Sequence, residues 1–121
     1  MQNPYQNYKQ QSISTMTQGE MLILLFDELV KRLTRAEFAV DAKEFELFDE
    51  SIQRCKDIIK YLKETLDLSY PISSELIRMY NFFDYTLVRI SASRNKELIE
   101  DLKPLVMDLR ETFKEANKIA R

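Results

Sequence analysis

Histidine is absent from this chain of 121 residues, and cysteine occurs once, as Cys55. Without a Cys/His cluster, the chain cannot build a zinc site, a Cys–His nucleophile or the Glu-x-x-His pairs of a four-helix di-iron centre. A single glycine, Gly19, leaves no glycine-rich loop for a phosphate and no glycine-containing acidic loop for calcium. The sequence therefore predicts no enzyme, no catalytic residue, no cofactor and no metal.

Charge and hydropathy exclude two further classes. The 18 basic and 20 acidic residues are mixed along the chain, so the basic footprint of a nucleic-acid-binding protein is missing. The longest apolar run, residues 21–26, is far shorter than the ~20 residues of a membrane span. The first eight residues do not combine a charged start with an apolar core, as a signal peptide would. We expect a cytoplasmic protein with no nucleic-acid partner and no membrane insertion.

Apolar residues recur at intervals of three and four along four segments, which is the spacing of amphipathic helices. Thr17 and Glu20 form a capping box at the first start, and Asn95 suits a cap at the last. Pro104 falls inside the last segment, where we expect a kink. The helices are expected over about 17–40, 43–67, 71–90 and 95–121.

Four helices of this length with short links predict an all-α fold, an antiparallel up-and-down four-helix bundle over residues 17–121. Each helix should bury one stripe, and Cys55 lies on the second as an inert buried thiol. The expected core residues are Leu22, Leu25, Phe26, Leu29, Leu33 and Ala36, then Phe45, Phe48, Ile52, Cys55, Ile59, Leu62 and Leu66, then Ile72, Leu76, Met79, Phe83, Leu87 and Ile90, then Leu98, Leu102, Leu105, Val106, Leu109, Phe113, Ala116 and Ala120.

Two of the predicted helices carry more apolar residues than one stripe can bury. This excess indicates an added layer: the N-terminal segment, a second subunit or a client peptide. The residues outside the stripes are Met21, Ile23, Leu24 and Val30 in the first helix and Tyr80, Phe82, Tyr85 and Val88 in the third.

Residues 1–16 form a separate N-terminal arm that is rich in glutamine and asparagine and has no helical stripe. One interpretation is an unattached chain end, which is the usual behaviour of termini. The other is an extended strap held on the bundle by Tyr5, Tyr8 and Ile13 as anchors. The sequence leaves both open.

Several short motifs, in order, resemble the FliS family of flagellin export chaperones. They cover residues 3 to about 118, which is nearly the whole chain. The matching residues are Asn3-Pro4-Tyr5, Tyr8, Ser12-Ile13, Thr15, Thr17-x-Gly19-Glu20, Leu25-Phe26-Asp27, Ile58-Ile59, Thr65-Leu66-Asp67, Met79-Tyr80, Leu109-Arg110, Phe113-Lys114 and Ala116.

The resemblance implies a cytoplasmic chaperone of flagellar type III export. Such a protein binds the disordered C-terminal region of flagellin, prevents premature polymerisation and delivers flagellin to the cytoplasmic domain of the export gate. The family also implies that the client wraps around the bundle as an extended chain with short helices, and that the arm covers part of the client groove when the client is absent.

For the client-binding residues we selected apolar side chains outside the core stripes: Ile58, Tyr61, Leu68, Tyr80 and Phe82. The alternative for each is packing under a neighbouring helix or under the arm. A second functional class also remains, a helical adaptor or structural bundle whose surplus apolar surface forms a homodimer. An enzyme is the third class and has the least support, because reactive groups are missing.

Overall fold

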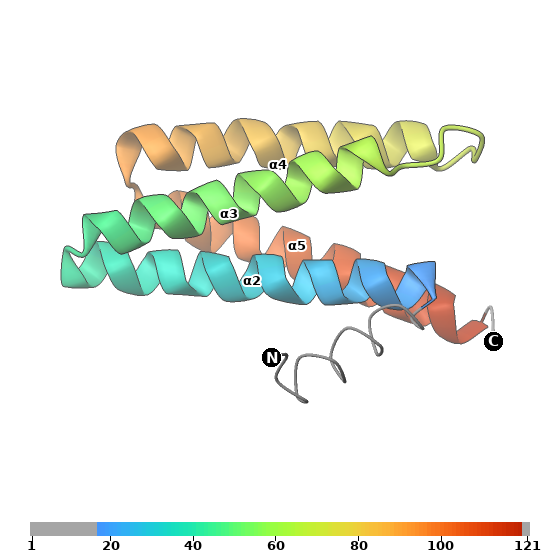
Figure 1. The fold of residues 1–121 in the computed structure, drawn as a ribbon, viewed down its shortest axis with the longest axis horizontal. Coiled ribbons are helices and arrows are strands. Elements are labelled where there is room, and N and C mark those ends of the chain that lie inside the picture. The colour runs from blue at the N-terminus through green and yellow to red at the C-terminus, as the bar shows by residue number, and fades with distance from the viewer. Residues whose placement is uncertain (1–16, 120–121) are drawn as a thin grey trace, which may run out of the picture.

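The computed structural model describes residues 17–119 as four helices packed antiparallel (Figure 1). Each helix contacts the next along the chain, and the last also contacts the first, so the four close into a ring around one core. The bundle predicted from the sequence is confirmed; Tyr5, Tyr8 and Ile13 of the arm fall outside the described residues. The helices are α2 (Gln18–Ala42), α3 (Phe45–Glu64), α4 (Ser73–Ser93) and α5 (Lys96–Ile119).

Local side-chain chemistry sets the helix ends. The hydroxyl of Thr17 accepts a hydrogen bond from the Glu20 amide at 3.2 Å, so the predicted N-cap of α2 is confirmed. Asn95 likewise accepts from the Glu97 amide at 2.9 Å before α5. Helix α2 is followed by a lysine, Lys43, in the left-handed conformation usual for glycine, with φ of 59°.

The connection over residues 65–72 is longer than predicted, because α3 ends at Glu64. The Asp67 carboxylate accepts hydrogen bonds from the amide and hydroxyl of Ser69, and these bonds lower the pKa of Asp67. Pro104 lies inside α5, and the kink expected there stays a prediction.

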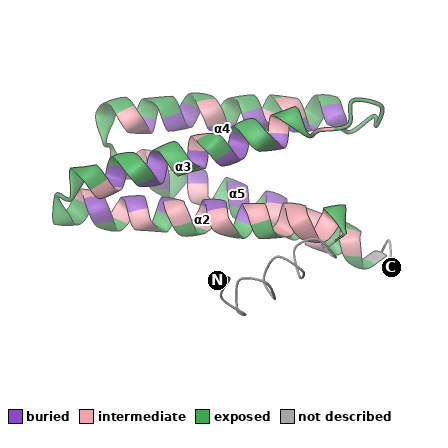
Figure 2. Ribbon diagram, viewed as in Figure 1, coloured by how far each residue is buried: buried purple, intermediate pink, exposed green. Residues whose placement is uncertain are grey.

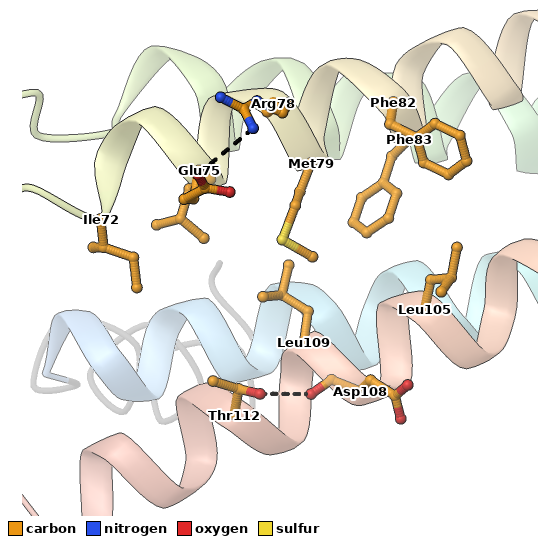
Figure 3. A pocket seen from close by; sticks show the side chains of 11 residues that line it. Ile72, Glu75, Arg78, Met79, Phe82, Phe83, Leu105, Asp108, Leu109 and Thr112 are labelled. Atoms are coloured by element: carbon orange, nitrogen blue, oxygen red, sulfur yellow. Dashed lines mark hydrogen bonds and ion pairs between the residues drawn. The ribbon is translucent and has the colours of Figure 1, made fainter.

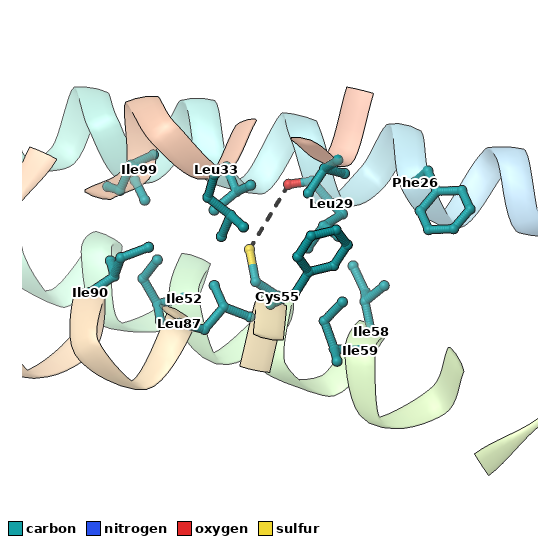
Figure 4. Packing of buried hydrophobic residues seen from close by; sticks show 14 of the residues in the cluster. Phe26, Leu29, Leu33, Ile52, Cys55, Ile58, Ile59, Leu87, Ile90 and Ile99 are labelled. Atoms are coloured by element: carbon teal, nitrogen blue, oxygen red, sulfur yellow. Dashed lines mark hydrogen bonds between the residues drawn. The ribbon is translucent and has the colours of Figure 1, made fainter. Parts of the chain in front are cut away.

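The core is a continuous apolar column along the inner faces of all four helices (Figure 2). Figure 4 shows Cys55 within it, its sulfur 4.0 Å from the carbonyl oxygen of Leu29. Most of the predicted core stripes are confirmed. Phe45, Ile72, Leu105 and Ala116 are the exceptions, since each is exposed, and Ala120 lies outside the described residues. The buried apolar residues are Phe26, Leu29, Leu33, Ala36, Ala39, Phe48, Ile52, Cys55, Ile58, Ile59, Leu62, Leu76, Tyr80, Phe83, Leu87, Ile90, Ile99, Leu102, Val106 and Leu109.

Two buried serines give a matched test of what a partner contributes to a buried hydroxyl. Within residues 17–119, the Ser51 hydroxyl has no hydrogen-bond partner, whereas the Ser73 hydroxyl donates to the Asp67 carbonyl oxygen. An unpaired buried polar group costs about 1–3 kcal/mol. We expect Ser51→Ala to raise the free energy of unfolding by about 1 kcal/mol and Ser73→Ala to lower it by a similar amount. Urea unfolding of both variants measures this, and a loss with Ser51→Ala would contradict it.

Candidate functional site

Helices α4 and α5 are the least closely joined neighbours in the bundle. Ion pairs fasten α5 to α2, including Lys103 Nζ to Glu37 Oε1 at 3.0 Å, and Lys63 on α3 lies 3.8 Å from Asp84 on α4. Between α4 and α5, the described part of the chain has neither a side-chain hydrogen bond nor an ion pair. These two helices therefore leave space between them.

That space is an apolar groove of about 660 Å³ that runs along both helices (Figure 3). Seven of its eleven lining residues are apolar, and in Figure 3 Met79 of α4 points across it toward Leu109 of α5. The centroids of the Phe82 and Phe83 rings are 6.4 Å apart, so Phe83 supports the Phe82 ring at the groove wall. The apolar lining residues are Ile72, Leu76, Met79, Phe82, Phe83, Leu105 and Leu109.

A smaller hollow of about 110 Å³ continues this groove toward the end of α4. Phe82 and Leu105 line both spaces, so the two form one path between α4 and α5. We call this path the α4–α5 groove. Phe82 is 51% exposed and Leu105 41% exposed, so both apolar side chains remain available for contact.

Charged residues border the α4–α5 groove on both of its sides. Arg78 and Asp108 line the larger space, while Arg89 and Asp101 line the smaller one. Both arginines are on α4 and both aspartates on α5. Glu75 of α4 also lines the larger space and forms an ion pair with Arg78 at 3.6 Å. The groove therefore has an apolar floor, an α4 wall with two arginines and a glutamate, and an α5 wall with two aspartates.

A second hollow of about 380 Å³ lies at the end of the bundle where α2 begins. The start of α2, the 65–72 connection and the end of α5 all contribute to it. A Cβ atom on Gly19 would lie 2.5 Å from Oδ1 of Asn117, so the glycine permits a close approach of α2 to α5. This hollow adjoins the point where residues 1–16 join the bundle.

Two of the five residues selected from the sequence are core residues, which corrects their placement. Ile58 and Tyr80 are almost fully buried, although Tyr80 also lines the second hollow. Helix α3 packs against both α2 and α4, and α4 against both α3 and α5, so each buries more than one stripe. The prediction that both side chains lie outside the core was wrong, and we do not propose either as an exposed client-binding residue.

The other three selected residues are exposed but do not gather at one place. Phe82 lines the α4–α5 groove, whereas Tyr61 and Leu68 line none of the hollows described in residues 17–119. Only Phe82 therefore lies where the groove would place a client contact.

Sequence reasoning missed the α5 wall, Leu105 and Leu109, and the α4 residues Ile72 and Met79. One signal was available. Leu105 and Val106 are adjacent, and adjacent residues on a helix cannot both face the same core. Val106 is fully buried and Leu105 is exposed to the groove.

Reactive side chains are scarce in the described region. Residues 17–119 contain no cluster of three His, Cys, Asp or Glu side chains able to hold a metal ion. Burial raises the pKa of the Cys55 thiol to about 12, so the nucleophilic thiolate is disfavoured. No helix in the same region is both long and apolar enough to cross a membrane.

The Cys55 thiol should resist modification while the protein is folded. We expect no reaction with a thiol reagent at about pH 8 under native conditions and complete reaction in denaturant, because only unfolding exposes the sulfur. The readout is unambiguous because the chain has one cysteine. Rapid native labelling would contradict this placement in the core.

A protein-family model described as "Flagellar protein FliS" matches residues 1–120. The chain is also 28% identical over 116 residues to the flagellar secretion chaperone FliS of Bacillus subtilis (strain 168), which covers 96% of this chain and 87% of that protein. The family match includes both helices that form the walls of the groove.

Proposed function

The chain belongs to the FliS family and is a flagellar secretion chaperone, and from this premise we propose that it holds the C-terminal region of flagellin in the α4–α5 groove. The observation that carries the proposal is the apolar groove between two helices that share no polar fastening. Occupying it would hide the flagellin surface that polymerises and would delay assembly until export. This function requires binding and no chemical reaction.

The apolar character of the groove fits a client that is disordered before it binds. Such a client bears an ordering cost, so it needs a large apolar contact area. Burying about 1,500 Å² of apolar surface would contribute roughly 38 kcal/mol of favourable binding free energy. The ordering cost and the loss of rigid-body freedom cancel most of this contribution. The larger space alone is too small for such an area, so the client would also contact exposed apolar residues beyond it, such as Tyr61, Leu68 and Val88.

The N-terminal arm has a place in the same proposal. We propose that residues 1–16 cover part of the groove through Tyr5, Tyr8 and Ile13 when flagellin is absent. An arm that competes in this way would lower the net affinity and favour exchange at the cytoplasmic domain of the export gate. The protein would work in the cytoplasm. Deleting residues 1–16 should tighten flagellin binding, and an unchanged affinity and release rate would count against competition.

Calorimetric titration with a peptide of about the last 50 residues of the flagellin from the same genome tests the function itself. A peptide of this length, when extended, reaches along the bundle. We expect one client segment per chain, with a strongly negative heat-capacity change because apolar surface is buried. Mass in solution with and without the peptide distinguishes the alternative. A stable homodimer that ignores the peptide would favour the structural adaptor.

A further inference from the structure

Helix α5 is the firmly held wall of the α4–α5 groove. It packs far more closely against α2 than against α4. Three ion pairs, spaced along its length, also fasten it to α2. They are Asp41 with Lys96, Glu37 with Lys103, and Asp27 with Arg110. If the width of the groove changes, α5 is therefore not the wall that moves.

Helix α4 is held by fewer polar contacts. Lys63 on α3 donates a hydrogen bond to Oδ1 of Asn81 at 3.3 Å, and its Nζ lies 3.8 Å from Oδ2 of Asp84. In the described chain, no other side-chain hydrogen bond or ion pair joins the residues of α3 to those of α4. Both charged side chains are partly exposed, and such ion pairs are weak. Lys63 is thus a single, weak polar tether for this helix.

The two ends of α4 are joined to the bundle in different ways. Residues 94–95 alone link α4 to α5, whereas residues 65–72 link α3 to α4 (Figure 1). At the short link, the guanidinium of Arg94 lies 4.3 Å from the centre of the Phe45 ring and 3.8 Å from the Asp49 carboxylate. The C-terminal end of α4 is therefore fixed, while the longer connection leaves slack at its N-terminal end.

Unfilled space follows the same gradient along α4. The groove holds about 660 Å³ beside the N-terminal half of the helix and about 110 Å³ beside its C-terminal half. The second hollow also reaches the N-terminal half, where Leu76 lines both that hollow and the groove. A gap that is wide at one end and narrow at the other is the shape expected when one wall pivots at the narrow end.

We propose that α4 is a movable wall of the α4–α5 groove, which pivots at Arg94 and is held closed by Lys63. When the contacts of Lys63 break, the N-terminal half of α4 moves away from the bundle and the wide end of the groove opens further. Local opening of this kind occurs where a folded protein has few packed contacts. The functional consequence rests on the proposed function: opening speeds the entry of the flagellin segment.

Native-state hydrogen exchange of the free protein tests this role of Lys63. Lys63→Glu places a carboxylate beside Asp84, so we expect amide exchange over residues 73–83 to rise roughly three- to fivefold while exchange in α2 stays the same. Lys63→Glu combined with Asp84→Lys restores opposite charges and should return exchange close to the wild-type rate. Raising the ionic strength should bring wild type and Lys63→Glu together, because salt screens exposed charges.

Lys60→Glu is the matched control, because it makes the same change in net charge about one turn earlier on α3. Lys60 is exposed and forms no ion pair within residues 17–119. Its reversal should leave the exchange of α4 unchanged. The proposal is overturned if Lys63→Glu has no effect, if exchange rises equally in all four helices, or if the charge swap fails to restore the wild-type rate.

The association rate of the flagellin C-terminal peptide links the movement to function. Stopped-flow mixing should show a roughly three- to fivefold faster association for Lys63→Glu, with the charge swap and Lys60→Glu both close to wild type. Faster exchange without faster association would overturn the role of α4 opening in client entry. Phe82→Ala tests the groove separately because it leaves Lys63 and its partners in place, so failure of the client site and failure of the movable wall give different results.

Discussion

We expect Phe82→Ala to weaken flagellin binding at least about 30-fold. This is a loss of about 2 kcal/mol or more of binding free energy, which is typical of an aromatic hot spot. Phe82 lines both parts of the α4–α5 groove, so its truncation removes the apolar contact at their junction. The free energy of unfolding should change by no more than about 0.5 kcal/mol, because the ring is half exposed in the free protein. Calorimetry with the flagellin peptide and urea unfolding give the two quantities.

Phe38→Ala is the matched control for this experiment. Phe38 is 61% exposed on α2 and lines none of the hollows described between Thr17 and Ile119. Both variants lose the same apolar atoms, so a difference between their flagellin affinities cannot result from a general loss of surface hydrophobicity. Equal losses of affinity in both variants, or none in either, would show that the groove is not the client site.

The helices and much of the core could be predicted because each depends on residues close in sequence. The Thr17 cap depends on an amide three residues away. The buried stripe of α3 depends on apolar residues three and four positions apart. Both signals are present in any short window of the chain. Residues 1–16 carry no such periodic signal, and the sequence left two interpretations for them.

The groove could not be predicted because it depends on how far apart two helices pack. Periodicity identifies the side of a helix that is apolar but not the number of helices that cover it. A single stripe for each helix placed Tyr80 outside the core, yet α4 packs against two neighbours and buries it. The same assumption placed Leu105 inside, although α5 packs mainly against α2 and leaves that side chain in the groove.

The surplus apolar residues also divide differently from the expectation. On α4, Phe82, Tyr85 and Val88 are exposed. On α2, Met21, Ile23 and Val30 are partly buried, and Leu24 alone of that set is exposed. The free apolar surface of the described bundle therefore lies more on α4 than on α2, and this asymmetry is consistent with the proposed client site on the α4–α5 side.

Tyr80→Ala should lower the free energy of unfolding by about 3–5 kcal/mol, the usual cost of truncating a buried aromatic residue. Tyr80 is 1% exposed, whereas Tyr61 is 48% exposed, so Tyr61→Ala should cost less than about 0.5 kcal/mol. Urea unfolding of both variants compares two tyrosines that sequence reasoning had placed in the same client-binding set. Similar losses in the two would contradict the division between core and surface.

Tyr80→Phe tests the same placement through pH, because it keeps the ring and removes the ionisable hydroxyl. Burial raises the pKa of Tyr80 to about 12, above its ordinary value of 10.0. The folded state therefore favours the neutral phenol, and this contribution is present below about pH 10 and is lost as the pH rises toward 12. Unfolding measured at rising pH should show less alkaline loss of stability in Tyr80→Phe than in wild type, with Tyr61→Phe as the control. Identical alkaline profiles for wild type and Tyr80→Phe would place the hydroxyl in water and remove Tyr80 from the core.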